Sequence, residues 1–247
     1  MRINDIIIKE TADYVILNKP AGLLTIPDRH DNHLDSIQGL LKKHYGEIFT
    51  VHRLDKDTSG IILFAKNEIA HKYYSQLFEG RNVKKFYKGL VNGQLHPASG
   101  SVDEPIMEHP TIKGRMVTNR KGKAALTDYV VEESFGLYSL VKLQIHTGRT
   151  HQIRLHMKHL GHPIAVDEQY GTAAPVLLSS IKKDYKLSKR VDEERPLLSR
   201  LALHAWQLHF TDQQGEEVIV EAPLPKDIQA VVTQLRKNSG RSTALIL

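Results

Sequence analysis

Short apolar runs typical of β-strands alternate along this chain with amphipathic stretches typical of α-helices. The strand patterns lie at 6–8, 14–17, 61–65, 84–91, 139–147 and 218–220. The helix patterns lie at 34–44, from Asn67 to Gly80, from Thr150 to Gly161, and from Pro225 onward. They do not recur at the spacing of about 30 residues that a series of βαβ units requires. This order predicts a single α+β domain over 1–247, with a mixed, mostly antiparallel sheet and flanking helices.

The same patterns predict which side chains face the core. In the helix that Asn67 begins, the apolar stripe is Ile69, Tyr73 and Leu77, and in the last helix it is Ile228, Val231, Val232 and Leu235. The helix capped by Thr150 has the apolar stripe Ile153, Met157 and Leu160 and the polar stripe His151, Arg154 and Lys158. In the strand at 139–147, one face holds Val141, Leu143 and Ile145. The segments 96–123 and 171–200 are predicted to be long surface excursions.

Composition excludes several classes of protein. The chain has no cysteine, which removes disulfide scaffolds, thiol catalysis and thiolate metal sites. It has no apolar stretch near the roughly 18 residues that a membrane span needs. Asp5 and Lys9 interrupt the apolar residues at the N-terminus, which therefore does not resemble a signal peptide. We expect a cytoplasmic protein that does not enter a membrane.

Positive charge is concentrated in the two predicted excursions. The formal net charge is +6, from 34 Lys and Arg against 28 Asp and Glu. One cluster is Lys113, Arg115, Arg120, Lys121 and Lys123, and the other is Lys182, Lys183, Lys186, Lys189 and Arg190. Each run alone is typical of a solvated loop, but two such runs favour a nucleic acid as the partner.

Motifs for other chemistries are absent. The sequence contains no P-loop, no G-x-G-x-x-G, no G-x-S-x-G and no H-E-x-x-H. There are 14 histidines, four of them at 151, 156, 159 and 162, but none stands at a recognised metal-ligand spacing with a carboxylate. We therefore expect no metal site, and a metal-dependent nuclease is a disfavoured reading.

The densest polar cluster is His52–Gly60, directly before the apolar run at 61–65. Asp, Thr, Ser and Gly in such a segment often serve only as turn residues. Arg53 and Asp55, however, flank Leu54 in a loop that a buried strand would hold rigid. Such a loop can present a carboxylate to a ligand at a fixed position.

This cluster and four other segments together resemble one family. The run HRLDKDTSGIILFAK (52–66) is similar to the catalytic motif of RNA pseudouridine synthases of the RluA family. The other matching segments are NKPAGL (18–23), KKFYKGLVNG (84–93), TGRTHQIRLHMKHLGHPIAVDEQYG (147–171) and RLALHAWQLHF (200–210). They occur in the family's order. The resemblance implies a pseudouridine synthase-like fold with a central RNA-binding cleft.

The resemblance also assigns roles to individual residues. Asp55 matches the catalytic nucleophile, and Tyr87 matches the tyrosine that stacks on the target uracil and takes part in proton transfer. Arg154 matches the basic residue that pairs with the catalytic aspartate, and Arg53 matches the arginine implicated in base flipping. One departure is Val166, which stands before Asp167 where the family often has glycine. It lies outside the catalytic positions, so it puts only the local loop geometry in question.

The chemistry of the reaction fits these residue types. Isomerising uridine breaks the C1′–N1 bond and makes a C1′–C5 bond, and a carboxylate can assist as a nucleophile. Attack on the sugar and attack on the base both remain open. Detached uracil must turn without escaping, which requires a closed pocket with a stacking ring, and Tyr87 supplies that ring. Phe86 is one residue earlier on the same predicted strand, so it is expected to face the opposite side. A competing reading, Asp55 and Asp57 as a glycosidase-like pair, is weaker because this pocket must prevent hydrolysis.

The resemblance therefore implies an isomerase that acts on structured ribosomal or transfer RNA and needs no cofactor. A uridine in a stem must leave its stack to react, so base flipping is expected. The matching segments begin within the first ten residues, so we expect no N-terminal S4-type domain, and a monomer is the default. The alternative from another class is a catalytically inactive RNA-binding or ribosome-assembly protein with the same fold.

Overall fold

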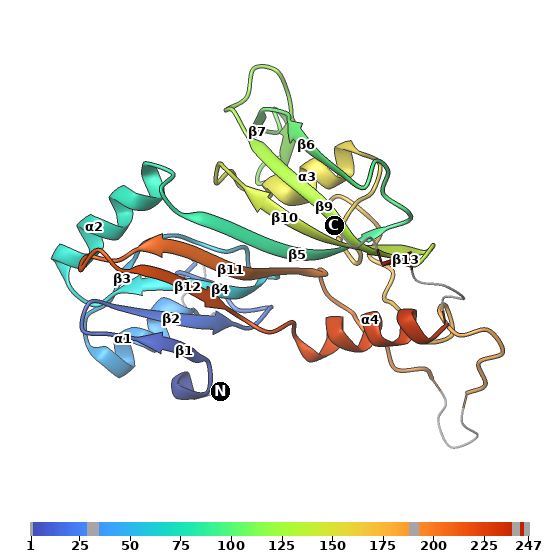
Figure 1. Ribbon diagram of the computed structural model, residues 1–247, viewed down its shortest axis with the longest axis horizontal. Helices are drawn as coiled ribbons and strands as arrows, with labels where there is room; N and C mark the ends of the chain where they lie inside the picture. The colour runs from blue at the N-terminus through green and yellow to red at the C-terminus, as the bar shows by residue number, and fades with distance from the viewer. Residues whose placement is uncertain (1, 29–34, 188–192, 239–242, 245–247) are drawn as a thin grey trace. The chain divides into compact units, whose positions relative to one another are not determined.

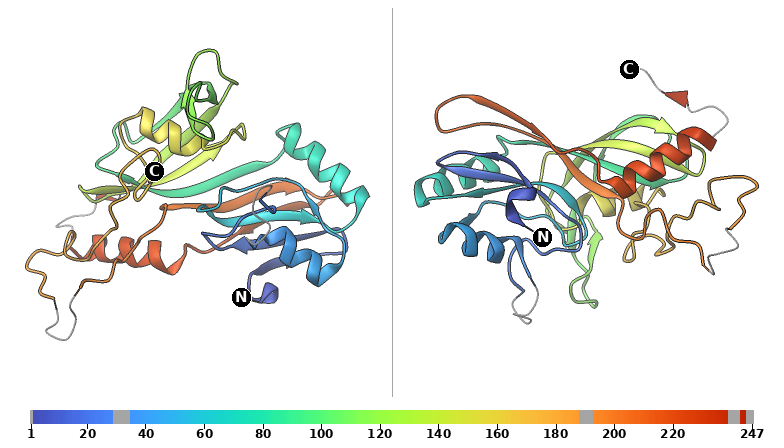
Figure 2. Two further views of the ribbon diagram at one scale, coloured as in Figure 1. Left: turned by 180° about the vertical axis from the view of Figure 1, so that it is seen from behind. Right: turned by 90° about the horizontal axis from the view of Figure 1, so that it is seen from below.

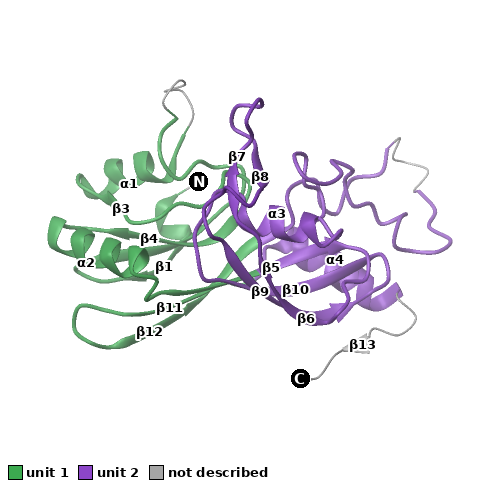
Figure 3. Ribbon diagram, turned by 90° about the horizontal axis from the view of Figure 1, so that it is seen from above, with its two compact units in different colours: residues 1–87, 204–223 green, residues 88–203, 224–247 purple. Residues whose placement is uncertain are grey.

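The computed structural model describes residues 2–28, 35–187, 193–238 and 243–244 (Figure 1). It divides into two compact units (Figure 3). Unit 1 comprises 1–87 and 204–223, and unit 2 comprises 88–203 and 224–247. The chain passes from unit 1 to unit 2 within strand β5 (Lys84–Asn92). The single domain and the central cleft predicted from the sequence stay predictions.

Unit 1 is organised around β4, whose seven residues are all buried. Its elements besides the first part of β5 are β1 (Ile7–Glu10), β2 (Tyr14–Lys19), α1 (Ile37–Tyr45), β3 (Phe49–Thr50), β4 (Ser59–Ala65), α2 (Glu68–Glu79), β11 (Leu203–Thr211, from its second residue) and β12 (Glu217–Glu221). β4 pairs antiparallel with β2 and β3 and parallel with β11. β11 continues into an antiparallel hairpin with β12, which is orange in Figure 2. The predicted strands at 14–17, 61–65 and 218–220 are confirmed, and β1 lies one residue later than predicted.

Helix α2 packs on one face of this sheet. The Asn67 side chain accepts a hydrogen bond from the Ala70 N–H at 2.8 Å, which confirms the predicted N-cap. The predicted stripe was wrong at Ile69, whose side chain is 76% exposed. Ala70 and Tyr74 are buried instead, in a core shared with β2, β4, β11 and β12, and Tyr73 and Leu77 lie at its margin. The predicted helix at 34–44 is α1, and its position 34 lies outside the described residues.

Unit 2 contains a second antiparallel arrangement of strands, centred on β9. Its elements besides the rest of β5 are β6 (Ser99–Asp103), β7 (Ile106–Glu108), β8 (Met116–Thr118), β9 (Leu126–Ser134), β10 (Tyr138–Ile145), α3 (Gln152–His159), α4 (Lys226–Asn238) and β13 (Thr243–Ala244). β9 pairs antiparallel with β10, β6 and β13. The predicted buried face of β10 is confirmed. The excursion predicted at 96–123 was wrong in part, because β6 joins the sheet and Val102 and Ile106 are buried.

The two helices of unit 2 differ in how well the pattern predicted them. All four apolar residues of the stripe in α4 are buried, as predicted. Helix α3 begins one residue later than predicted, because His151 rather than Thr150 is the N-cap. Arg154, predicted on a polar face, is only 7% exposed. Six consecutive residues from Gln152 to Met157 are buried, so α3 is enclosed on nearly all sides.

The observed architecture confirms the predicted class, α+β with a mostly antiparallel sheet. The described part of 171–200 contains no helix or strand, only an isolated bridge between Val176 and Leu198. None of the helices in the described part of the chain is long and apolar enough to cross a membrane.

Candidate active site

The loop that carries Asp55 lies directly before β4 and is braced by the segment after β2. Lys19, at the end of β2, is fully buried. Its ammonium donates hydrogen bonds to the backbone carbonyls of Pro20, Leu23 and Lys56, at 3.0, 2.8 and 2.9 Å. A buried ammonium is tolerated only when its protons have hydrogen-bond partners. These three bonds therefore join the segment after β2 to the loop that carries Asp55.

A second contact braces the residue before Asp55. The hydroxyl of Thr25 donates to the carbonyl of Leu54 at 2.8 Å and accepts from the Leu54 N–H at 3.1 Å. Leu54 is buried, whereas the neighbouring Arg53 is exposed and Asp55 is partly exposed. The loop therefore anchors its apolar residue and leaves the two polar ones accessible.

At the other end of the loop, Gly60 allows β4 to lie against β11. Gly60 has φ +114° and pairs with Ala205, and a Cβ at this position would lie 2.2 Å from the Ala205 carbonyl oxygen. The preceding Ser59 hydroxyl lies 2.9 Å from Nδ1 of the fully buried His204. These contacts require glycine at position 60 and fix where β4 begins.

His52, at the start of the loop, is held as a neutral ring. Its Nε2 accepts the Leu63 N–H at 3.1 Å, and its ring stacks on Phe78 with centroids 4.3 Å apart. Burial lowers the pKa of His52 to about 3, and the positive charge of Lys85 acts in the same direction. His52 thus serves as a hydrogen-bond acceptor that ties the start of the loop to β4.

Tyr87 is the electrostatic neighbour of Asp55 within unit 1. Its side chain is buried, at 9% exposure, on β5. Burial raises the pKa of the Tyr87 hydroxyl above its ordinary value, and the negative charge of Asp55 raises it further. The phenol is therefore protonated at neutral pH and lies within the field of the carboxylate. Phe86, the preceding residue, is half-buried, with its ring 5.2 Å from that of His209 on β11.

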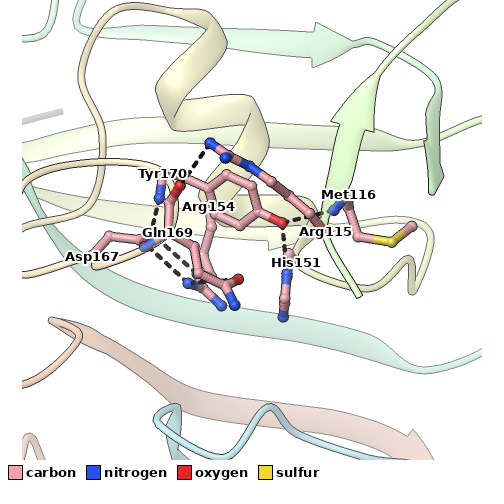
Figure 4. A network of polar contacts seen from close by, with 7 residues as sticks. All are labelled: Arg115, Met116, His151, Arg154, Asp167, Gln169 and Tyr170. Carbon is pink, nitrogen blue, oxygen red and sulfur yellow. Dashed lines mark hydrogen bonds and ion pairs between the residues drawn. The ribbon is translucent and has the colours of Figure 1, made fainter. Parts of the chain in front are cut away.

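Arg154, on α3 in unit 2, forms a paired hydrogen bond with Asp167 (Figure 4). Its Nε and Nη2 donate to the two carboxylate oxygens, each at 2.8 Å, and Nη2 also lies 3.4 Å from Oε1 of Gln169. The Asp167 side chain is fully buried and also accepts the N–H groups of Gln169 and Tyr170. Burial raises the pKa of Asp167, but the hydrogen bonds and charge of Arg154 outweigh it and hold the pKa below its ordinary value.

Helix α3 is itself fastened to β9 by polar contacts. The amide of Gln152 donates to the Leu126 carbonyl at 2.9 Å and to the Thr127 hydroxyl at 3.0 Å. The fully buried His156 lies 2.9 Å from the same hydroxyl through Nδ1, and burial lowers the pKa of this imidazole. Gln152 and His156 thus fix the helix that carries Arg154.

Comparison with known proteins decides the family. The sequence model of one protein family, described as RNA pseudouridylate synthase, matches residues 13–159, more than half of the chain. The chain belongs to this family. The resemblance found in the sequence is thereby confirmed.

Individual relatives agree with the family match. The ribosomal large subunit pseudouridine synthase D of Nitrosomonas europaea is 37% identical over 237 residues, which cover 93% of this chain and 65% of that protein. An uncharacterized RNA pseudouridine synthase of Bacillus subtilis, YlyB, is 34% identical over 243 residues, covering 93% of this chain and 72% of the relative. This chain thus spans slightly less than two thirds of the Nitrosomonas protein.

Solved structures confirm the pseudouridine synthase fold. Human RNA pseudouridylate synthase domain containing 4 matches with a TM-score of 0.72 and 28% identity, covering 95% of this chain and 94% of that one. Human RNA pseudouridylate synthase domain containing 1 matches with a TM-score of 0.66 and 27% identity, covering 94% of each chain.

In this member of the family, the negative charge of Asp55 acts on the Tyr87 hydroxyl, and Arg53, two residues before Asp55, is exposed. The pairing of Arg154 with Asp55 stays a prediction. Sequence reasoning missed Lys19 and Thr25, which brace the loop, and Asp167, which holds Arg154. Lys19 and Asp167 lie inside matching motifs, but only their burial with polar partners indicates their roles.

The basic run at 113–123 lies on a hairpin of unit 2. We define the basic hairpin as residues 106–123, which begins with β7 and β8 and closes through paired backbone hydrogen bonds between Ile106 and Lys123. Four of its cations are exposed: Lys113, Arg120, Lys121 and Lys123. In the second run, Lys182, Lys183 and Lys186 are described, and positions 189 and 190 lie outside the described residues. Among described residues, no three His, Asp or Glu side chains gather as metal ligands would.

Proposed function

We propose that this protein is an RNA pseudouridine synthase that isomerises uridines in structured RNA, with Asp55 as the catalytic carboxylate. The observation that carries the proposal is the carboxylate of Asp55 acting on the buried phenol of Tyr87, in a loop braced by Lys19 and Thr25. A fixed carboxylate whose charge acts on a protonated ring hydroxyl supplies a nucleophile and a proton donor in one unit.

The reaction breaks the C1′–N1 bond of uridine and forms the C1′–C5 bond. Asp55 assists as a nucleophile, on the sugar or on the base, so that detachment and reattachment occur at one site. C5 loses its proton after the new bond forms, and N1 gains one. The Tyr87 hydroxyl is suited to this exchange because it is neutral at pH 7 and lies within the electrostatic field of the carboxylate.

Tyr87 and the two arginines have complementary roles in binding. The ring of Tyr87 stacks on the uracil and keeps the detached base from escaping. The exposed side chain of Arg53 takes the place of the flipped base. Arg154, which Asp167 orients, is assigned to pair with the catalytic carboxylate in the reaction.

Ribosomal RNA is the substrate that the relatives favour, with transfer RNA as the second possibility. The Nitrosomonas relative is named for the large ribosomal subunit. The exposed cations of the basic hairpin and of 182–186 suit the phosphates of a folded RNA, which is recognised largely by shape and backbone contacts.

The test is to incubate the purified protein with transcripts of large-subunit ribosomal RNA and of transfer RNAs, and to map pseudouridine in the products. We expect pseudouridine at defined positions with the wild-type protein. Asp55→Asn should form none while its RNA affinity stays within about threefold, because phosphate contacts dominate affinity. The control is Asp57→Asn, an exposed carboxylate in the same loop, which should remain active.

The alternatives give different results in the same experiment. RNA binding by the wild-type protein without pseudouridine on any transcript would favour the inactive RNA-binding protein. Turnover by Asp55→Asn would remove Asp55 from the mechanism. Release of free uracil would indicate a hydrolase instead.

A further inference from the structure

Tyr170 lies between Arg154 and the basic hairpin, in contact with both (Figure 4). The guanidinium carbon of Arg154 is 4.9 Å from the centroid of the Tyr170 ring, within the range of a cation–π contact. The Tyr170 backbone N–H donates to Oδ1 of Asp167, an oxygen that also accepts from Arg154. Tyr170 and Arg154 are therefore fixed to the same buried carboxylate.

The hydroxyl of Tyr170 reaches the hairpin. It accepts the N–H of Met116, the first residue of β8, at 3.0 Å, and lies 2.8 Å from Nδ1 of His151, the N-cap of α3. A tyrosine oxygen can accept one hydrogen bond and donate another, so one group joins the hairpin to the start of the helix.

Two further contacts keep the hairpin in this position. Arg115 donates to the Gln169 carbonyl at 3.2 Å, and Gln169 in turn contacts Arg154. An apolar cluster lies underneath, formed by Ile106, Ala125, Leu155 and Tyr170 with Met116 at its edge. The root of the hairpin therefore shares its packing with Leu155, the neighbour of Arg154 on α3.

We propose that Tyr170 is a positioning residue that couples the basic hairpin to Arg154. RNA phosphates bound by the hairpin would then set the position of the guanidinium as well as add affinity. This inference rests on the proposed function, because it gives Arg154 a role in the reaction.

The coupling predicts an effect on the reaction rate that a role of Tyr170 in packing alone does not predict. If phosphate contacts on the hairpin act only through affinity, saturating RNA compensates for their removal. If they also place Arg154, the rate at saturation falls, because reacting groups must be held closely in a productive arrangement. Removing the Tyr170 hydroxyl should abolish this dependence.

The test is a double-mutant cycle on the single-turnover rate at saturating RNA. One change is Tyr170→Phe, which keeps the ring and the apolar packing. The other is the combination Lys113→Gln, Arg120→Gln and Lys121→Gln, which leaves Arg115 and its contact in place. Tyr138→Phe is the matched control, since Tyr138 is a partly exposed tyrosine in the same unit.

We expect Tyr170→Phe to slow the reaction roughly tenfold, within the range that small misplacements cost. The triple variant should slow wild type but not further slow Tyr170→Phe, while weakening RNA binding in both. Additive effects of the two changes, or an unchanged rate in Tyr170→Phe, would overturn the coupling and leave the proposed function intact. Absence of pseudouridine with the wild-type protein would overturn both. Tyr138→Phe should react at the wild-type rate, and equal slowing there would also overturn the coupling.

Discussion

Lys19 donates a hydrogen bond to the backbone carbonyl of Lys56, 37 positions further along the chain and one residue after Asp55. The same carbonyl accepts the N–H of Gly22 at 2.9 Å. The turn after β2 and the loop before β4 therefore share one acceptor, and the buried ammonium holds the two together.

The Lys19→Met variant tests this brace. Methionine keeps much of the side-chain volume but leaves three carbonyl oxygens without their charged donor. We expect the free energy of unfolding to fall by about 3 kcal/mol, the cost of leaving buried polar groups unpaired. Urea unfolding measures it. Lys56→Met is the control, because it removes an exposed side chain and keeps the backbone carbonyl, and an equal loss there would contradict the brace.

Sequence patterns predicted the elements whose signal is local. The Asn67 cap, the buried strand β4 and the stripe of α4 each depend on spacing within a few residues, and all three are present. The prediction that Ile69 is buried was wrong because α2 packs on the sheet through Ala70 and Tyr74. Tertiary packing determines which face of the helix is buried. Periodicity alone cannot distinguish two overlapping stripes on one helix.

The candidate site was predictable in its residue types but not in its supporting contacts. The helical pattern predicts Arg154 on a polar face. In the structure Arg154 is buried, because it pairs with Asp167 in the segment that follows the helix, and helical periodicity does not show this contact. The burial of Lys19 likewise depends on a partner far along the chain, the Lys56 carbonyl. A buried charge is evident only when its partners are known.

The departure at Val166 has a structural explanation. Val166 has φ +56°, in the left-handed region, directly before Asp167. A β-branched residue is strained there, whereas glycine is not, which accounts for the glycine often found in the resembling motif. The departure from the family motif at Val166 therefore coincides with an unusual backbone conformation, directly before the carboxylate that holds Arg154.

Acid should destabilise the fold through His52. The folded pKa is about 3, against an ordinary 6.5, so between these values the unfolded chain binds a proton that the folded chain does not. The contribution of the neutral His52 ring to the free energy of unfolding is complete above pH 6.5. It is lost as the pH falls toward 3, by up to about 1.4 kcal/mol per pH unit. His52→Gln, whose amide oxygen can accept the Leu63 N–H, should show a shallower fall in urea unfolding between pH 6.5 and 5. Identical slopes would mean that folded His52 accepts the proton.

The basic hairpin should contribute to the salt dependence of RNA binding. Lys113→Gln with Lys121→Gln should weaken binding and reduce the slope of log K against log salt by roughly 0.7–0.9 for each phosphate that is no longer neutralised. Lys42→Gln with Lys43→Gln on α1 removes the same charge from exposed positions elsewhere and should change the slope less. Anisotropy titrations between about 50 and 200 mM salt measure both. Equal slopes in the two double variants would mean that the hairpin cations act only through the net charge of the protein and do not contact phosphates directly.

Tyr87→Phe separates the hydroxyl of Tyr87 from its ring. Phenylalanine keeps the buried ring on β5 and its proposed stacking on uracil, and loses only the hydroxyl that can exchange a proton. We expect the variant to melt within a few degrees of wild type and to bind RNA normally. It should form pseudouridine at least about 10²-fold more slowly, the low end of general acid–base effects. Single-turnover assays at saturating enzyme measure the rate: a wild-type rate would leave Tyr87 as a stacking ring alone, and a collapsed melting temperature would make its hydroxyl a structural group.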